Sequence, residues 1–534
     1  MDSAETPEMS ARRWAREMTA RRRPRALRKF IRSRSAALAL AAGLLLGFAA
    51  TGFAAGLLGG SQGGSLPNLA PLPSPGTGSI PAPDSGSGLD TGTILGPSLS
   101  IPLSSPTLSP LNDPLASLPT IGSDLPLGVS PDLKDLSNNV RQSVQAAGNA
   151  GRPIRNGFVL PAAGERRFVA NEVVLAVPSI PAQTLDAIAK RHHLTLVGSR
   201  SLALTGHTLY RWRIDDGRSV ADVIRALAGE QRISAAQPNF TFTLQQQQTG
   251  ASPSAGDPAQ YAVGKLRLAE AHRLANGNNV LVALIDSGID GSHPELAGVV
   301  AASYDAVSED ARPHPHGTAM AGAIAAHGKL IGVAPRVRLL AIRAFGAGPE
   351  QEGTTFGILA GLDWAVQHGA RVVNMSFAGP ADPALQDALA KARKKGLVLI
   401  AAAGNAGPKS PPLYPAADPN VIAVTATDRN DRLYAQANPG SYIALAAPGV
   451  DILAPAPNGS VQLATGTSIA AAHVSGIAAL LIERKPSLRP DEIRKILVST
   501  ARHIGEKPRD NEYGAGLADA LDAVSALQPK SAEK

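Results

Sequence analysis

From Asp257 onward, short apolar runs alternate with longer segments in which apolar residues recur every three or four positions. A short apolar run is typical of a strand buried on both faces, and the longer period is typical of a helix packed on a sheet. The pattern therefore predicts an α/β domain over 257–527, with a mainly parallel sheet flanked by helices, and a tail at 528–534. The predicted strands span 280–285, 338–342, 370–375, 397–402 and 421–424.

One predicted helix runs from Ser468 to Leu481 and is apolar or small on nearly every side, so we expect it to lie at the centre of the domain. Gly466, just before it, can adopt backbone conformations that are closed to other residues. Ser468 would lie beside the free N–H groups at the positive end of the helix, where negative charge on a reacting carbonyl is stabilised. The plainer interpretation of Ser468 is a helix N-cap.

A smaller unit is predicted at 165–244, before the α/β domain. Its expected elements, in order, are a strand at 172–177, a helix at 182–191, a strand at 209–214, a helix capped by Ser219 and a strand at 235–243. An α+β unit of about 80 residues is near the lower size limit for an independent hydrophobic core. The polar segment 245–256 that follows has the composition of a connector.

The N-terminal segment has the charge pattern of an export signal. Residues 1–35 contain eleven Arg or Lys and four acidic residues, and residues 36–58 carry no charge. The apolar run is long enough to span a bilayer, and the basic residues before it predict that the chain after it is exported. It is either a secretory signal, cleaved after a site such as Gly52-Phe53-Ala54, or a retained signal anchor, which its length favours. A buried core helix is the weaker alternative, because no amphipathic pattern is present.

Residues 59–157 are rich in Pro, Gly, Ser and Leu and have no sustained period. Repeated proline prevents helices and central strands alike. We therefore predict a disordered, low-complexity linker between the apolar run and the small unit.

The absence of cysteine and the distribution of charge each exclude some kinds of site. The 534 residues include no cysteine, so neither disulfides nor thiolate metal sites are expected. The formal net charge of +8 comes mostly from residues 1–35, so the remaining chain is close to neutral. It lacks the basic face that a nucleic-acid-binding domain needs, and we expect no nucleic-acid partner.

Three polar residues stand where a parallel sheet gathers its functional groups, at strand ends and helix starts. Asp286 ends the first strand, His316 opens a helix of small residues, and Ser468 opens the buried helix. Each alone has an ordinary explanation as a turn, helix-start or capping residue. Their order along the chain, Asp then His then Ser, is that of the subtilisin triad.

The sequence resembles the subtilisin-like serine proteases (the subtilase family, peptidase S8) in three motifs: Ile285-Asp286-Ser287-Gly288-Ile289, His316-Gly317-Thr318 and Gly466-Thr467-Ser468-Ile469-Ala470. The resemblance covers about 257–527 and implies the family's fold and endopeptidase activity. It implies that Ser468 attacks the scissile carbonyl, that His316 transfers the proton and that Asp286 orients the imidazole. Asn405, in a glycine-flanked loop, matches the family's side-chain donor to the oxyanion.

The same resemblance assigns residues to substrate binding, with the peptide added as a strand between two edges. One edge is assigned to Ser376, Phe377, Ala378 and Gly379. Arg343-Ala344-Phe345-Gly346 is expected to supply the opposite edge. Gly404 is also assigned to substrate binding, and Leu413 to the floor of the primary specificity pocket. Ala378 replaces a usual glycine, which is expected to narrow access there.

Next to this domain, the unit at 165–244 resembles the inhibitor-like propeptide of these proteases, a small ferredoxin-like α+β domain. The resemblance rests on element order, on position and on the ending Gln237-Pro238-Asn239-Phe240-Thr241-Phe242. It implies a self-processed zymogen in which the propeptide is an intramolecular inhibitor and 245–256 is a cleavable connector. A permanent accessory domain is the alternative.

The chain departs from the family pattern at Ile469, in place of Met, and at Ala472, in place of Pro; neither exchange should abolish the chemistry. The reaction requires no cofactor. The family's strong calcium site needs oxygen ligands from a loop that here, between His327 and Val333, is short and has no Asp or Asn. We expect that site to be absent, we leave a weaker calcium site open, and we assign no metal ligand.

Several polar residues are expected to have structural or solvated roles. The motif His314-Pro315-His316 lacks a third ligand at a spacing that would suit a metal ion. His314, His327 and His473 are expected to have structural or solvated roles. Asp290 and Glu295 are expected to be capping or solvated rather than catalytic.

The sequence therefore predicts an exported serine endopeptidase that acts on proteins or peptides and, if residues 36–58 are uncleaved, is held at the membrane by them. A catalytically inactive subtilase fold used as a binding module is the alternative, and the intact set of polar residues argues against it. A serine esterase of the α/β-hydrolase class would need Gly-x-Ser-x-Gly and the order Ser, Asp, His. Ala470 stands at the second glycine position, so this class is disfavoured.

Overall fold

The computed structural model describes residues 153–178, 180–245, 247–249, 260–307, 312–346 and 352–528. The predicted segments 1–35 and 36–58 lie outside the described residues. So do residues 59–152 of the predicted linker, the connector residues 246 and 250–256, and the tail beyond residue 528. Within the described ranges, no helix is both long and apolar enough to cross a membrane.

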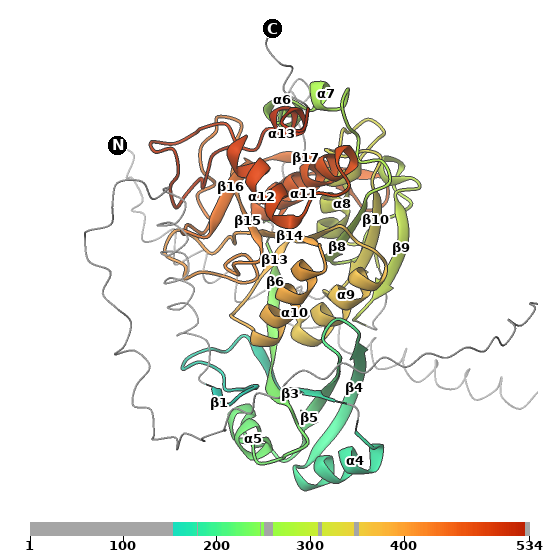
Figure 1. Ribbon diagram of the computed structural model, residues 1–534, viewed down its shortest axis with the longest axis vertical. Helices are drawn as coiled ribbons and strands as arrows, with labels where there is room; N and C mark the ends of the chain where they lie inside the picture. The colour runs from blue at the N-terminus through green and yellow to red at the C-terminus, as the bar shows by residue number, and fades with distance from the viewer. Residues whose placement is uncertain are drawn as a thin grey trace, which may run out of the picture. The chain divides into compact units, whose positions relative to one another are not determined.

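The large domain is built on a sheet whose seven strands, counted among the described residues, are all parallel. Their spatial order is β16-β15-β14-β12-β8-β10-β9 (Figure 1). In chain order they are β8 (Leu281–Asp286), β9 (Val300–Asp305), β10 (Arg338–Arg343), β12 (Val372–Met375), β14 (Val398–Ala402), β15 (Ile422–Thr427) and β16 (Ile443–Pro448). The prediction of an α/β fold with a mainly parallel sheet is confirmed.

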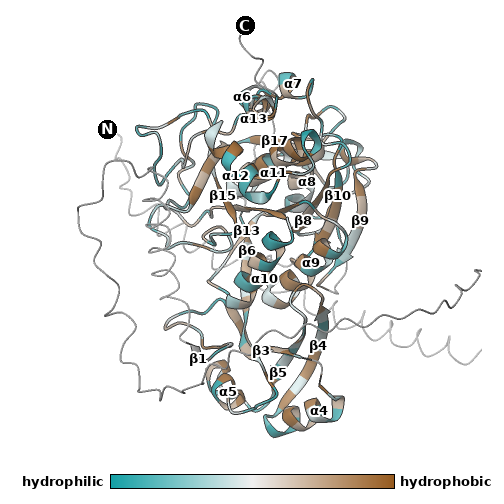
Figure 2. Cartoon of the chain, viewed as in Figure 1, coloured by the Kyte–Doolittle hydropathy of each residue, from teal (hydrophilic) through white to brown (hydrophobic). Residues whose placement is uncertain are grey.

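In every strand of this sheet except the edge strand β9, residues contribute to two separate cores. In β8, Val282 and Leu284 pack into one core, and Ala283 and Ile285 into the other. The strands other than β9, which is mostly half-buried, are therefore buried on both faces, and this is why they read as nearly continuous apolar runs. Most of their length is coloured hydrophobic in Figure 2.

Helices cover both faces of the sheet, as the alternating pattern predicted. The helices of the first core are α6 (Tyr261–Lys265), α7 (Leu268–Ala271), α8 (Pro315–Ala325), α11 (Thr467–Arg484), α12 (Pro490–Ser499) and α13 (Ala520–Ser525). Those of the second core are α9 (Thr355–Gln367) and α10 (Pro383–Lys394). A short 3-10 helix, η1 (Pro294–Leu296), precedes β9.

Helix α11 is the central helix, and its residues are buried from Thr467 to Ile482. Its N-cap is Gly466, with φ of 150°, a value that L side chains rarely adopt. Ser468 is the second residue of the helix, so the interpretation of Ser468 as an N-cap is wrong. The glycine turn lets the helix begin abruptly, which leaves the Ser468 side chain at its open end.

The small domain is an α+β unit with its own core around Val173, Trp212 and Ile224. Its strands pair in the order β1-β2-β6-β3-β5-β4. The elements are β1 (Pro153–Arg155), β2 (Phe158–Val159), β3 (Phe168–Val177), α4 (Ala182–Arg191), β4 (Leu194–Leu202), β5 (His207–Ile214), α5 (Val220–Leu227) and β6 (Ala235–Leu244). Strand β4 is not among the predicted elements, and most of its residues are exposed or half-buried.

Strand β6 belongs to both domains (Figure 1). Its first half pairs with β3, and its last four residues pair with two short strands of the large domain, β11 (Glu352–Thr354) and β13 (Phe377–Ala378). A little further along the chain, β7 (Gln247–Thr249) joins β17 (Ile452–Ala456) and β18 (Ser460–Thr465) in a third sheet. The predicted connector therefore begins inside ordered sheet structure.

Candidate active site

Asp286 lies at the carboxyl end of β8 and is fully buried. Its Oδ1 accepts the backbone N–H of Ser287 at 2.7 Å and the Nδ1–H of His316 at 2.6 Å. A buried carboxylate in this position fixes the imidazole tautomer, because Nδ1 carries the proton and Nε2 is left with its lone pair.

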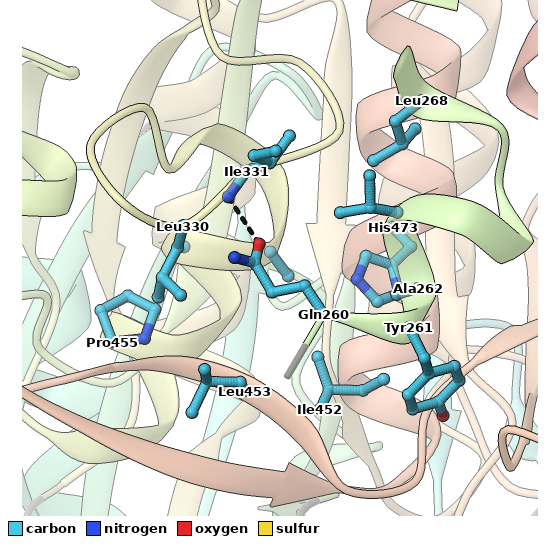
Figure 3. A pocket seen from close by; sticks show the side chains of 13 residues that line it. Gln260, Tyr261, Ala262, Leu268, Leu330, Ile331, Ile452, Leu453, Pro455 and His473 are labelled. Atoms are coloured by element: carbon cyan, nitrogen blue, oxygen red, sulfur yellow. Dashed lines mark hydrogen bonds between the residues drawn. The ribbon is translucent and has the colours of Figure 1, made fainter. Parts of the chain in front are cut away.

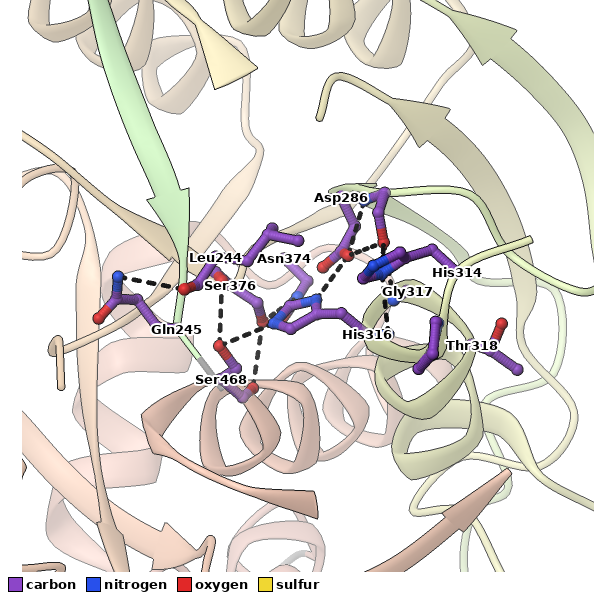
Figure 4. A network of polar contacts seen from close by, with 12 residues as sticks. Leu244, Gln245, Asp286, His314, His316, Gly317, Thr318, Asn374, Ser376 and Ser468 are labelled. Atoms are coloured by element: carbon purple, nitrogen blue, oxygen red, sulfur yellow. Dashed lines mark hydrogen bonds and ion pairs between the residues drawn. The ribbon is translucent and has the colours of Figure 1, made fainter. Parts of the chain in front are cut away.

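His316 is in the first turn of α8 and is 2% exposed. Its Nε2 lies 3.2 Å from Oγ of Ser468, on the side of the ring away from Asp286 (Figure 4). Gly317 follows it, and a Cβ there would lie 2.8 Å from the carbonyl oxygen of Ser287. A glycine is therefore needed for helix α8 to approach the end of β8 this closely.

Ser468 is buried at the start of α11. Its Oγ lies 3.2 Å from His316 Nε2 and 3.0 Å from the carbonyl oxygen of Ser376, so its one proton has two acceptors within reach. Its backbone N–H, at the positive end of an 18-residue helix, donates at 3.3 Å to the carbonyl oxygen of Gln245. The structure thus brings together Asp286, His316 and Ser468, which are far apart in the sequence.

The carbonyl of Gln245 occupies the site that a reacting carbonyl would need. The backbone N–H of Gln245 donates to Ser376 at 3.1 Å, which continues the pairing of β6 with the edge formed by β13. Its side-chain Oε1 accepts the backbone N–H of Asn405 at 2.7 Å. The chain enters the site through β6 and leaves through β7, so the Gln245–Gln246 peptide bond is the one next to Ser468.

Asn405 is held by its side-chain oxygen, which accepts the backbone N–H of Thr467 at 3.1 Å and its hydroxyl at 2.9 Å. Its side-chain amide nitrogen is buried and has no partner within the described ranges. A buried amide without an acceptor is costly, so one is expected to be satisfied during function. The arrangement leaves Nδ2 free to donate to a nearby oxyanion.

The predicted substrate edge lies along the bound strand. Phe377 and Ala378 form β13, and Gly379 follows with so little room that a Cβ there would lie 2.3 Å from the ring of Phe242. The Phe242 and Phe377 rings meet edge to face, with centroids 5.8 Å apart. The opposite edge is Glu352–Thr354 and not the predicted stretch at 343–346, from which Phe345 instead pairs with Gly353.

Leu413 and Gly404 lie together beside the bound strand. A Cβ on Gly404 would lie 2.9 Å from Cδ1 of Leu413, and Gly404 has φ of 115°. An open cavity of about 440 Å³ is bordered by Gln245, Ala378, Asn405 and Leu413. Leu413 therefore borders the same cavity as Gln245, and Gly404 lies against Leu413.

The large domain is similar in sequence to known proteins. A profile of the subtilase family matches residues 277–516. The chain is 38% identical over 249 residues to subtilisin DY of Bacillus licheniformis, an alignment that covers 45% of this chain and 89% of that protein. The chain belongs to the subtilase family. As a subtilase it is a serine endopeptidase, and its substrates are proteins or peptides.

Two further relatives extend the comparison. This subtilase is 36% identical over 270 residues to thermitase of Thermoactinomyces vulgaris, across 48% of this chain and 95% of that protein. It is also similar to the crystal structure of fervidolysin from Fervidobacterium pennivorans, described as a keratinolytic enzyme related to subtilisin. That similarity has a TM-score of 0.58 and 26% identity, and it covers 72% of this chain and 65% of the other.

In the loop at 327–333 of the subtilase, side-chain oxygens of the protein accept the backbone N–H groups. The Glu295 carboxylate is buried and accepts three backbone N–H groups, of Gly328, Lys329 and Leu330, at 2.9 to 3.0 Å. Gln260 accepts the N–H of Ile331 at 2.7 Å (Figure 3). These oxygens already face donors, so the residues present do not fit a cation. Glu295, expected to be capping or solvated rather than catalytic, is a buried acceptor for the backbone N–H groups of this loop.

Two other polar residues of the subtilase are buried. Asp290 accepts the N–H of Asn458 at 2.9 Å and the hydroxyl of Ser292 at 2.6 Å, so it joins two loops. His473 borders the cavity in Figure 3, where burial lowers its pKa to about 4. Its Nδ1 donates to the carbonyl of Pro448 at 2.9 Å. Neither side chain reaches Ser468.

Sequence reasoning missed two features of the site. One is Gln245, because an uncharged amide in a Gln-rich stretch carries no chemical signal. The other is Ser287, whose Oγ lies 3.1 Å from Asp286 and from His314 and accepts the N–H of Gly317 at 3.0 Å. Its place directly after Asp286 in the first motif was the available signal.

Proposed function

We propose that Asp286, His316 and Ser468 hydrolyse peptide bonds through an acyl-enzyme. The Ser468 hydroxyl gives its proton to His316 Nε2 as Oγ forms a bond to the carbonyl carbon. The C–N bond then breaks, and His316 returns the proton to the leaving amine. Water repeats the sequence on the ester and releases the acid. Asp286 stabilises the imidazolium, and the Ser468 N–H and Asn405 Nδ2 stabilise the oxyanion.

We also propose that the chain is a zymogen that cuts itself between Gln245 and Gln246. One observation carries this proposal: the Gln245 carbonyl lies on the Ser468 N–H while the flanking strands pair on both sides of the bond. The first cut is therefore intramolecular, and the small domain is left with its last strand in the cleft. A permanent accessory domain would have no reason to end in this position.

The test is the N-terminus of the active enzyme. We expect mass spectrometry of freshly processed protein to show a chain that begins at Gln246 and a fragment that ends at Gln245. The same sample should be labelled at Ser468 by a fluorophosphonate. A first cut elsewhere in 247–256 would contradict the assignment of the bond, and absence of label would support the inactive binding module.

We further propose that the chain is exported, with residues 1–35 on the cytoplasmic side. The support is the basic segment followed by the uncharged run at 36–58. Fractionation of expressing cells separates the two forms. Recovery of the enzyme from membranes, resistant to high salt, indicates a retained anchor. Release into the medium indicates a cleaved signal, and protein in the cytosol contradicts export.

The loop at 327–333 leads to a proposal about calcium: the enzyme is stable without this ion at that loop. Glu295→Gln, made in the inactive Ser468→Ala chain to prevent self-digestion, is expected to lose about 2 kcal/mol of unfolding free energy, because charged acceptors are replaced by one neutral oxygen. Denaturant unfolding measures this, with exposed Glu506→Gln as the matched control. Addition of EDTA is expected to leave the unfolding midpoint unchanged. A midpoint that falls with EDTA and recovers with calcium would contradict the proposal.

A further inference from the structure

His314 stands directly before the helix that carries the catalytic histidine. It is the N-cap of α8, and its Nδ1 accepts the backbone N–H of His316 at 3.2 Å. The backbone of His314 is itself fixed, because its N–H donates to Gly288 at 2.9 Å and its carbonyl accepts from Thr318 at 3.1 Å. The ring is therefore placed to hold the first turn of α8.

The same ring nitrogen also faces the carboxylate side of the site (Figure 4). His314 Nδ1 lies 3.1 Å from Oγ of Ser287, and that Oγ lies 3.1 Å from Oδ1 of Asp286. One hydroxyl thus links the second histidine to the carboxylate that orients the first. The sequence assigned His314 a structural or solvated role and gave no sign of this link to Ser287 and Asp286.

We propose that His314 is a positioning residue for His316 and that it acts only as the neutral imidazole. This inference rests on the proposed triad. A neutral ring with its proton on Nε2 offers the Nδ1 lone pair to the His316 N–H. A protonated ring has a proton on Nδ1, which can donate only to Ser287, so the His316 N–H loses its acceptor.

The charges around His314 also favour its neutral form. An imidazolium at residue 314 would lie at the positive end of α8 and close to His316, which must itself become positive during the reaction. Among the described residues, the titratable groups that act on His314 are Asp286, at the end of β8, and His316, in the helix that His314 caps. Burial and His316 lower the pKa of His314, and Asp286 opposes them. The neutral form is therefore the one present near neutral pH.

The test is the pH profile of kcat on a peptide substrate between about pH 5 and pH 8. On the acid side of the profile, the kcat of the wild type is expected to fall more steeply with pH than a single protonation would allow, because two histidines must both be neutral. His314→Asn keeps a side-chain oxygen that can accept the backbone N–H of His316 but does not titrate. The kcat of this variant should therefore fall at acid pH with the slope of a single protonation. His314→Ala removes the acceptor at every pH, so its kcat should be roughly fivefold below wild type at neutral pH, the size of a lost N-cap, and the difference should shrink toward acid pH, where the wild-type ring has lost its acceptor too.

A control separates this effect from a general effect of histidine replacement. His368→Asn changes an exposed histidine at the end of α9 and should leave the wild-type profile unchanged. Equal slopes in wild type and His314→Asn would overturn the inference. Unfolding midpoints of each variant establish that a lower kcat is not a loss of folded enzyme. Ser468→Ala tests the triad independently, so hydrolysis that depends on Ser468 but is indifferent to His314→Asn would overturn only the role of His314.

Discussion

Replacement of Ser468 by alanine is expected to abolish peptide hydrolysis and to leave the chain uncut after Gln245. The hydroxyl lies 3.2 Å from His316 Nε2, and the backbone N–H of the same residue donates to the Gln245 carbonyl oxygen, so we expect no neighbour to replace it as nucleophile. We expect kcat to fall by about a millionfold, the size that loss of the nucleophile has in a subtilisin. Turnover of a fluorogenic peptide and the mass of the purified chain are the measurements.

Two controls make this result specific. Ser499→Ala changes a hydroxyl on the exposed side of α12 and should leave processing and turnover unchanged. A catalytic amount of active enzyme added to the Ser468→Ala chain should cut it in trans, which shows that the chain can be processed once a nucleophile is supplied. Normal self-processing of Ser468→Ala would remove the basis for the assigned triad.

The second large effect is expected at Asn405. Replacing it by alanine should lower kcat by about 100- to 1000-fold with little change in KM, because its amide donates to charge that exists only in the transition state. That range comes from the corresponding experiment on a subtilisin. The kcat and KM of the processed variant, from initial rates on a peptide, are the quantities to compare.

Replacement of Asn405 by aspartate separates two roles of the side chain: donor to the oxyanion and acceptor for Thr467. Asn405→Asp keeps an oxygen that can accept from Thr467, as Asn405 Oδ1 does, but it has no N–H to give. We expect it to be as slow as Asn405→Ala or slower. A variant with aspartate that turns over at the wild-type rate would mean that Asn405 serves only to hold Thr467.

The sequence was sufficient for elements that carry a strong local period. The five predicted strands correspond to β8, β10, β12, β14 and β15, because a strand buried on both faces leaves a run of apolar residues. Helix α11 was predicted as central because its apolar residues leave no polar face. Asp286, His316 and Ser468 could be proposed together because each stands in a motif at a strand end or helix start.

Features that depend on distant partners could not be read in this way. Strand β4 lies at the edge of its sheet with one neighbour, so its alternation is weak. The three residues of β11 become a strand only because β6 lies beside them. Glu295 looks like a surface carboxylate, and it is buried only because the backbone of a loop more than 30 positions later turns its N–H groups toward it.

Because β6 pairs with strands of both domains, we expect activity to appear later than the cleavage after Gln245. Breakage of the bond after Gln245 releases none of the pairing that holds residues 241–244 against β11 and β13. The first half of the strand is meanwhile anchored in a sheet with its own core, so the strand cannot slide out alone. Activity should thus appear only after a lag, whose length reports how fast the whole small domain departs or is degraded. Substitutions that weaken the core around Trp212, far from Ser468, are expected to shorten that lag.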